Sequence, residues 1–152
     1  MKQFLKTAGI IVFALFLSSC AEEQPEIDKS FYIEFGTECG WCAGQEYIKV
    51  TEQKVLYTLA IPCGENEGTT TDSRNLTAEE WQEIIDSFDY DQFLTLNYNE
   101  CNVCVDGCDE IIRINEEDEF HELRYSPGEE IQGMENLKTR LKAILEEFSS
   151  SN

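Results

Sequence analysis

The alternation of apolar and polar residues predicts a largely extended first half of the chain. The segment FYIEF alternates, which places Phe31, Ile33 and Phe35 on one face of a half-buried strand. Two strand-like runs joined by a short polar turn predict a β-hairpin over residues 46–61. A second pair of such runs predicts another hairpin over residues 110–125.

Apolar residues at helical spacing predict two helices. The first begins at Thr77, whose side chain can accept a hydrogen bond from the amide of Glu80 while that glutamate reaches back, an arrangement known as a capping box. Its apolar stripe consists of Trp81, Ile84, Ile85 and Phe88. The second helix covers about residues 134–148, and a short further helical turn ends near Leu96.

The order of these elements indicates an α+β fold. It contains an antiparallel sheet, made of an N-terminal strand and two β-hairpins, with two helices packed on one face. Residues 62–75 are rich in Gly, Thr and Asp and are predicted to form a loop. Residues 97–109 carry three cysteines and many turn residues, which predicts irregular structure.

The first nineteen residues have the pattern of an export signal. Lys2 and Lys6 form a positive head, and residues 8–17 are an apolar run that is too short to span a hydrocarbon core of about 30 Å. The segment therefore predicts a signal peptide over residues 1–19. It does not predict a transmembrane anchor.

Leu17-Ser18-Ser19-Cys20 resembles the lipobox of bacterial lipoproteins. The resemblance implies that Cys20 is lipidated and becomes the first mature residue, with a tether over residues 20–30, a domain over 31–148 and a tail over 149–152. Several acyl chains anchor a soluble domain stably, since each buried methylene adds about 0.8 kcal/mol. Ala21 after the cysteine favours the outer membrane, on its periplasmic or its surface-exposed side.

The net charge limits the classes of molecule that this protein is expected to bind. Removing residues 1–19 takes away two of the 11 basic residues and none of the 31 acidic ones, so the net charge moves from −20 to −22. Such a charge repels phosphate backbones and anionic head groups, which argues against nucleic-acid binding. A basic protein or an envelope component fits this charge, although dispersed acidic residues also serve solubility alone.

Six cysteines remain once Cys20 is assigned to lipid. An even number in an exported domain predicts disulfides, with fifteen pairings that the sequence does not distinguish. The candidates are Cys39, Cys42, Cys63, Cys101, Cys104 and Cys108. They lie in the segments around the two hairpins, so bridges among them are expected to tie together loops at the ends of the sheet.

Cys39-Gly40-Trp41-Cys42 also has the spacing of a redox couple. Thiol–disulfide oxidoreductases place such a motif at a helix N-terminus, which lowers the pKa of the first thiol. The residues that follow Cys42 are typical of a strand, so this helix is not expected. A thiol–disulfide oxidoreductase at Cys39 and Cys42 is therefore an alternative hypothesis. Trp41 in the same turn has two interpretations, an exposed contact or an aromatic ring packed on a disulfide.

Cys39 and Cys42 could also combine with Cys101 and Cys104 in a tetrahedral zinc site. Oxidation competes for these thiolates in an exported protein, so structural zinc is a second alternative. No metal or other cofactor is predicted.

The remaining polar groups indicate no enzyme site. His121, the only histidine, shares a strand face with Leu123 and Tyr125 and fits a partly buried strand position. The acidic residues at 86–91 and 116–119 lack the spacing of a calcium loop. The element order loosely resembles that of small, uncharacterised cysteine-rich bacterial lipoproteins, a likeness that implies no activity. The sequence therefore predicts a lipid-anchored envelope lipoprotein that acts as a non-catalytic binding or structural module.

Overall fold

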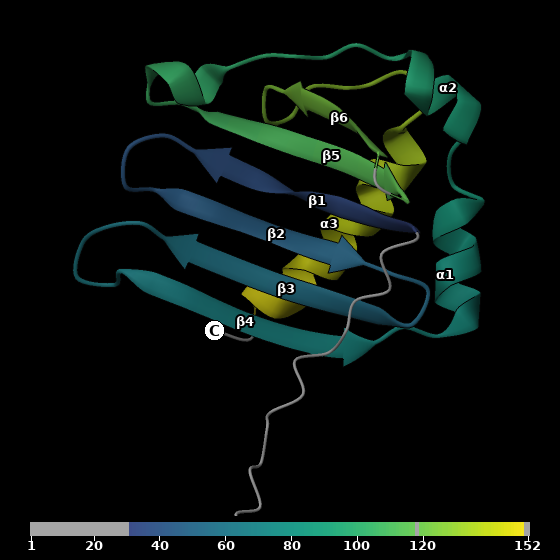
Figure 1. Cartoon of the computed structure of the whole chain (residues 1–152), viewed down its shortest axis with the longest axis horizontal. Coiled ribbons are helices and arrows are strands. Elements are labelled where there is room, and N and C mark those ends of the chain that lie inside the picture. The colour runs from purple at the N-terminus through teal and green to yellow at the C-terminus, as the bar shows by residue number, and fades with distance from the viewer. Residues whose placement is uncertain (1–30, 118, 151–152) are drawn as a thin grey trace, which may run out of the picture.

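The computed structural model describes residues 31–117 and 119–150, whose strands form a six-stranded antiparallel sheet in the order β4-β3-β2-β1-β5-β6 (Figure 1). This arrangement confirms the predicted α+β class and both predicted hairpins, β2–β3 and β5–β6. The strands are β1 Phe31–Cys39, β2 Gly44–Val50, β3 Lys54–Ile61, β4 Gly68–Asn75, β5 Cys108–Glu116 and β6 Glu119–Tyr125.

Strand β4 corrects the prediction of a loop over residues 62–75. It pairs with the whole of β3, from Lys54 opposite Asn75 to Ile61 opposite Gly68. Seven of its eight residues are exposed, so no apolar alternation marks it in the sequence. The run of threonines nevertheless favours extended backbone, because β-branched side chains fit a pleated surface.

Helix α3, Glu135–Ser149, lies across one face of the sheet and closes the core (Figure 1). Its spacing matches the predicted stripe, and Phe148 stacks on Tyr57 of β3 with 5.3 Å between ring centroids. Full burial of one such side chain contributes about 1.5–3 kcal/mol relative to exposure. The buried residues of this helix are Leu137, Leu141, Ile144, Leu145 and Phe148.

Helices α1, Ala78–Ile85, and α2, Tyr90–Thr95, pack at the end of the sheet where β1 begins (Figure 1). The predicted capping box is present: the amide of Glu80 donates to Thr77 Oγ1 at 3.1 Å, and the amide of Thr77 donates to Glu80 Oε2 at 2.8 Å. Such a cap contributes about 1 kcal/mol. The ring of Phe31 meets Trp81 of α1 and Tyr90 of α2 edge-on, which joins β1 to both helices.

The segment after α2 runs back along the outer edge of the sheet. The amide of Arg124 in β6 donates to the carbonyl of Tyr98 at 2.9 Å, and the amide of Glu100 donates to the carbonyl of Arg124 at 3.0 Å. These bonds satisfy an edge strand that would otherwise be free to pair with other chains. They also carry the chain to a 3₁₀ turn, η1 Asn102–Val105, at the opposite end from α1.

The predicted signal peptide, Cys20 and the tether to residue 30 lie outside the described residues. Across residues 31–117 and 119–150, no helix is both long enough and apolar enough to cross a membrane.

Candidate functional site

All three disulfides gather at one end of the sheet, which we call the stapled end and define as residues 39–44, 61–68 and 101–108. Cys39 pairs with Cys108 between directly opposed positions of β1 and β5. Cys42 pairs with Cys63 and joins the β1–β2 turn to the β3–β4 loop. Cys101 pairs with Cys104 inside the η1 turn. The predicted disulfide framework is therefore confirmed, whereas the expected tie between loops is made by the Cys42–Cys63 bridge alone.

These pairings change the interpretation of the first Cys-x-x-Cys motif. Cys39 and Cys42 belong to different bridges, so they are not bonded to each other as the two cysteines of an oxidised redox couple would be. No helix follows Cys42, because β2 starts at Gly44. The zinc alternative required thiolates from both motifs, and all six of the predicted disulfide cysteines are bonded in pairs.

Trp41 is the most exposed large apolar side chain among the described residues, at 83%. It occupies the left-handed backbone region with φ of 57°, a conformation that costs a non-glycine residue on the order of 1–3 kcal/mol. The turn that holds it lies between two disulfide-bonded residues, Cys39 and Cys42. The indole is thus held in solvent on a strained backbone position between two bridged residues.

Gly40 fixes the β1–β2 turn against η1. Its amide donates to the carbonyl of Gly107 at 2.9 Å, and a Cβ at this position would lie 2.7 Å from the carbonyl oxygen of Val103. Only glycine permits this approach. The contact places Trp41 and the 79% exposed Val105 at the same end of the molecule.

A hollow of about 630 Å³ adjoins Trp41 at the stapled end. Its walls come from the β1–β2 turn, the β3–β4 loop and η1, and they include the backbone of Gly44 and the side chains of Ile61, Pro62 and Val103. The hollow therefore combines apolar wall surface with an exposed indole at its rim.

Exposed carboxylates lie on the segments that form this apolar surface, and one of them, Glu67, lines the hollow. The three segments of the stapled end contain no lysine or arginine, and their acidic residues are solvent-exposed. Glu100 lies next to them along the chain and is also exposed. The acidic residues concerned are Glu65, Glu67, Glu100 and Asp106, which we call the acidic rim.

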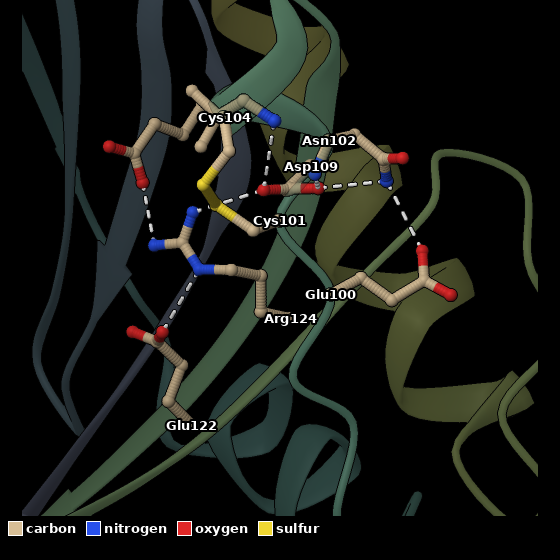
Figure 2. The surroundings of a disulfide bond; sticks show 9 residues. Glu100, Cys101, Asn102, Cys104, Asp109, Glu122 and Arg124 are labelled. Carbon is tan, nitrogen blue, oxygen red and sulfur yellow. Dashed lines mark hydrogen bonds and ion pairs between the residues drawn. A yellow bond between two sulfur atoms is a disulfide. The ribbon is translucent and has the colours of Figure 1, made fainter.

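Asp109 anchors the η1 turn through hydrogen bonds, and this residue is fully buried. Its Oδ1 accepts hydrogen bonds from the amide and the side-chain nitrogen of Asn102, at 2.8 and 2.9 Å, and its Oδ2 accepts the amide of Val103 at 3.4 Å. Figure 2 shows this carboxylate between Asn102 and the guanidinium of Arg124. Burial raises the pKa of Asp109, but the hydrogen bonds outweigh burial and bring that pKa below its ordinary value.

Arg124 is held by three carboxylates beside the Cys101–Cys104 disulfide (Figure 2). It contacts Glu38 at 2.7 Å and both Asp109 and Glu122 at 3.3 Å. Burial raises the pKa of Glu122. Contacts with Arg113 and Arg124 lower this pKa by more than burial raises it, so it lies below its ordinary value. The arginine is therefore committed to structure and is not available to a ligand.

The network of ion pairs around Arg124 continues along the face of the sheet away from α3. Arg113 of β5 bridges Glu34 of β1, at 2.7 Å, and Glu122 of β6. Gly36 belongs to β1, and a Cβ there would lie 2.1 Å from the carbonyl oxygen of Glu46 in β2. A hollow of about 180 Å³ lies beside Gly36 and Tyr47. The surrounding charges are paired with one another, so this smaller hollow offers a ligand little uncompensated charge.

The other polar groups considered in the sequence have structural partners. His121 Nε2 lies 2.8 Å from the carbonyl oxygen of Leu96, and the ring meets Phe93 edge-on. Asp89 caps α2 by accepting the amide of Gln92 at 3.0 Å. Within residues 31–117 and 119–150, no three His, Cys, Asp or Glu side chains form a group that could hold a metal ion.

The sequence predicted the cysteines of this site, but it did not settle the exposure of Trp41 and did not indicate the role of Asp109. The exposed Trp41 was one of two readings of its turn, and Asp109 gave no signal because its partners at residues 102 and 103 depend on a turn that has no sequence pattern. A scan of the chain against protein-family models finds no match, and a search against curated proteins finds none either.

Proposed function

We propose that this protein is a lipid-anchored envelope lipoprotein whose domain binds a basic protein or envelope component through the stapled end. The observation that carries the proposal is Trp41, 83% exposed on a turn held by two disulfides. Tryptophan is enriched among the residues that dominate binding energy, and a rigid turn reduces the entropy lost on association. A folding role alone gives no reason to hold an indole in water at a strained φ.

The acidic rim supports the choice of a basic partner. Residues that dominate binding are surrounded by polar residues that exclude water, and complementary charge steers association and selects the partner. Glu65, Glu67 and Asp106 supply exposed negative charge on segments of the stapled end that contain no lysine or arginine, and Glu100 adds to it next to η1. Binding is therefore expected to weaken as the salt concentration rises.

Lipid anchoring rests on the sequence Leu17-Ser18-Ser19-Cys20. The variant Cys20→Ala is expected to lose the lipid and to leave the membrane fraction, because no acyl chain can be attached to alanine. Cell fractionation combined with metabolic labelling by a palmitate analogue measures both effects. Retention of the variant in membranes with undiminished label would show that Cys20 is not the anchor.

Site-directed photo-crosslinking in intact cells tests the binding surface. A photoreactive amino acid at position 41 or 105 is expected to yield the same adduct, and that adduct is expected to decline when Glu65, Glu67 and Asp106 are replaced with their amides. Phe120 is the matched control, because it is 64% exposed but lies on β6 at the opposite end of the sheet. Adducts of equal yield from position 120, or none from 41 and 105, would contradict the proposal.

A further inference from the structure

The Cys101–Cys104 disulfide differs from the other two in what it connects. Cys39–Cys108 joins residues 69 positions apart and Cys42–Cys63 joins residues 21 apart, whereas Cys101 and Cys104 are three apart. The stabilisation expected from restricting the unfolded chain decreases in the same order, because this effect grows with loop length. The third bridge ties one turn to itself, so it adds least to the fold.

This bridge is also the one most open to attack. Cys101 and Cys104 are both solvent-exposed residues, whereas the cysteines of the other two bridges are all partly buried. Thiol–disulfide exchange requires an incoming thiolate to reach a sulfur atom, so its rate depends on access. Val105, which follows directly, is exposed as well and gives an incoming peptide an apolar contact.

The η1 turn has supports that do not involve the sulfur atoms. Asp109 accepts the amides of Asn102 and Val103, the amide of Gly107 donates to the carbonyl of Asn102 at 2.8 Å, and the amide of Cys104 donates to the carbonyl of Cys101 at 3.2 Å. These bonds hold the two Cα atoms 5.3 Å apart, within the range that a disulfide spans. After reduction, the same bonds keep the thiols close enough to reoxidise.

We propose that Cys101–Cys104 is a reversible disulfide that exchanges with the thiols of other exported proteins. A substrate thiolate attacks one sulfur, forms a mixed disulfide and releases the other cysteine as a thiolate. The second substrate thiol then displaces the first cysteine. Two electrons and two protons pass from the substrate dithiol, which becomes a disulfide, to Cys101 and Cys104, which become thiols; a second disulfide reverses the process.

This activity goes beyond the binding role and is independent of it. The two remaining bridges hold the sheet end while the third one opens, because Cys39–Cys108 closes β1 on β5 and Cys42–Cys63 closes the two adjacent loops. Asp109 acts here as a positioning residue, since it holds the turn and does not touch the sulfur chemistry directly.

Equilibration of the folded mature domain with reduced and oxidised glutathione tests the assignment. Free thiols are trapped by alkylation and located by peptide mass spectrometry, and circular dichroism monitors the sheet. Cys101 and Cys104 are expected to be alkylated at least about tenfold faster than the other four cysteines, with no loss of the sheet signal. Labelling of Cys39, Cys42, Cys63 or Cys108 first, or labelling only after unfolding, would overturn the proposal.

Two variants sharpen the test. Asp109→Asn is expected to shift the glutathione equilibrium toward the dithiol by about tenfold, because a looser turn lowers the effective concentration of one thiol near the other. Glu38 contacts the same Arg124 but does not hold η1. The variant Glu38→Gln is therefore expected to leave the glutathione equilibrium unchanged. Equal shifts in both variants would refute the positioning role, and an unreactive bridge in the wild type would refute the exchange itself.

Discussion

Replacement of both Cys39 and Cys108 by alanine is expected to lower the free energy of unfolding by about 4 kcal/mol. This bridge closes the longest loop, and the residues of the other two bridges all lie within the segment it encloses. Its loss therefore releases more conformational freedom in the unfolded chain than the loss of either of the others. It also removes a covalent link between β1 and β5, two neighbouring inner strands that carry the core residues Ile33 and Ile112.

Denaturant unfolding under non-reducing conditions measures this effect. The matched control is Cys101→Ala with Cys104→Ala, which is expected to cost about 2 kcal/mol because its loop is so short. The ranking is more informative than either value, since strain and residual structure shift individual numbers. A larger loss in the control than in the Cys39/Cys108 variant would show that the η1 bridge, and not the bridge between strands, limits stability.

The Asp109→Asn variant is expected to lose about 3 kcal/mol at neutral pH, because a buried carboxylate that accepts several hydrogen bonds and faces Arg124 is replaced by an amide. The amide nitrogen of the new side chain would face donors from Val103 or Arg124. Denaturant unfolding measures this loss, and Glu38→Gln provides the control. Glu38 contacts the same arginine while partly exposed, so we expect its variant to lose less than about 1 kcal/mol.

The effect of Asp109 depends on pH in a defined direction. Its pKa is lower in the folded than in the unfolded protein, so ionisation of this group stabilises the fold above the ordinary aspartate value of about 3.9. This stabilisation is lost as the pH falls through the lower pKa of the folded state. The difference between wild type and Asp109→Asn is therefore expected to shrink below about pH 4, and a difference independent of pH would exclude ionisation as its source.

Local patterns were sufficient to predict most of the fold. Alternation identified β1 and both hairpins, and the reciprocal hydrogen bonds of Thr77 and Glu80 marked the start of α1. These elements bury one face, so their side chains carry the pattern that burial requires. Strand β4 has neither face buried, and its place is set by backbone pairing with β3, which leaves no apolar alternation in the sequence.

The candidate site was less predictable because its parts meet only in three dimensions. The choice among fifteen disulfide pairings depends on sheet register, which sets Cys39 opposite Cys108. The pairing of Cys42 with Cys63 likewise depends on which loops share an end of the sheet. The exposure of Trp41 depends on what packs around its turn in three dimensions, so the sequence of the turn alone could not establish it.

The direction of β1 has a consequence for how the domain would stand above a membrane. Phe31 lies beside α1 and α2, and the strand runs nine residues, or about 30 Å, to Cys39 at the stapled end. With the lipid anchor that we propose at Cys20, the chain would enter the domain at the end remote from Trp41. Trp41 would then lie about 30 Å from the point where the chain enters the domain, at the end that the tether does not reach first.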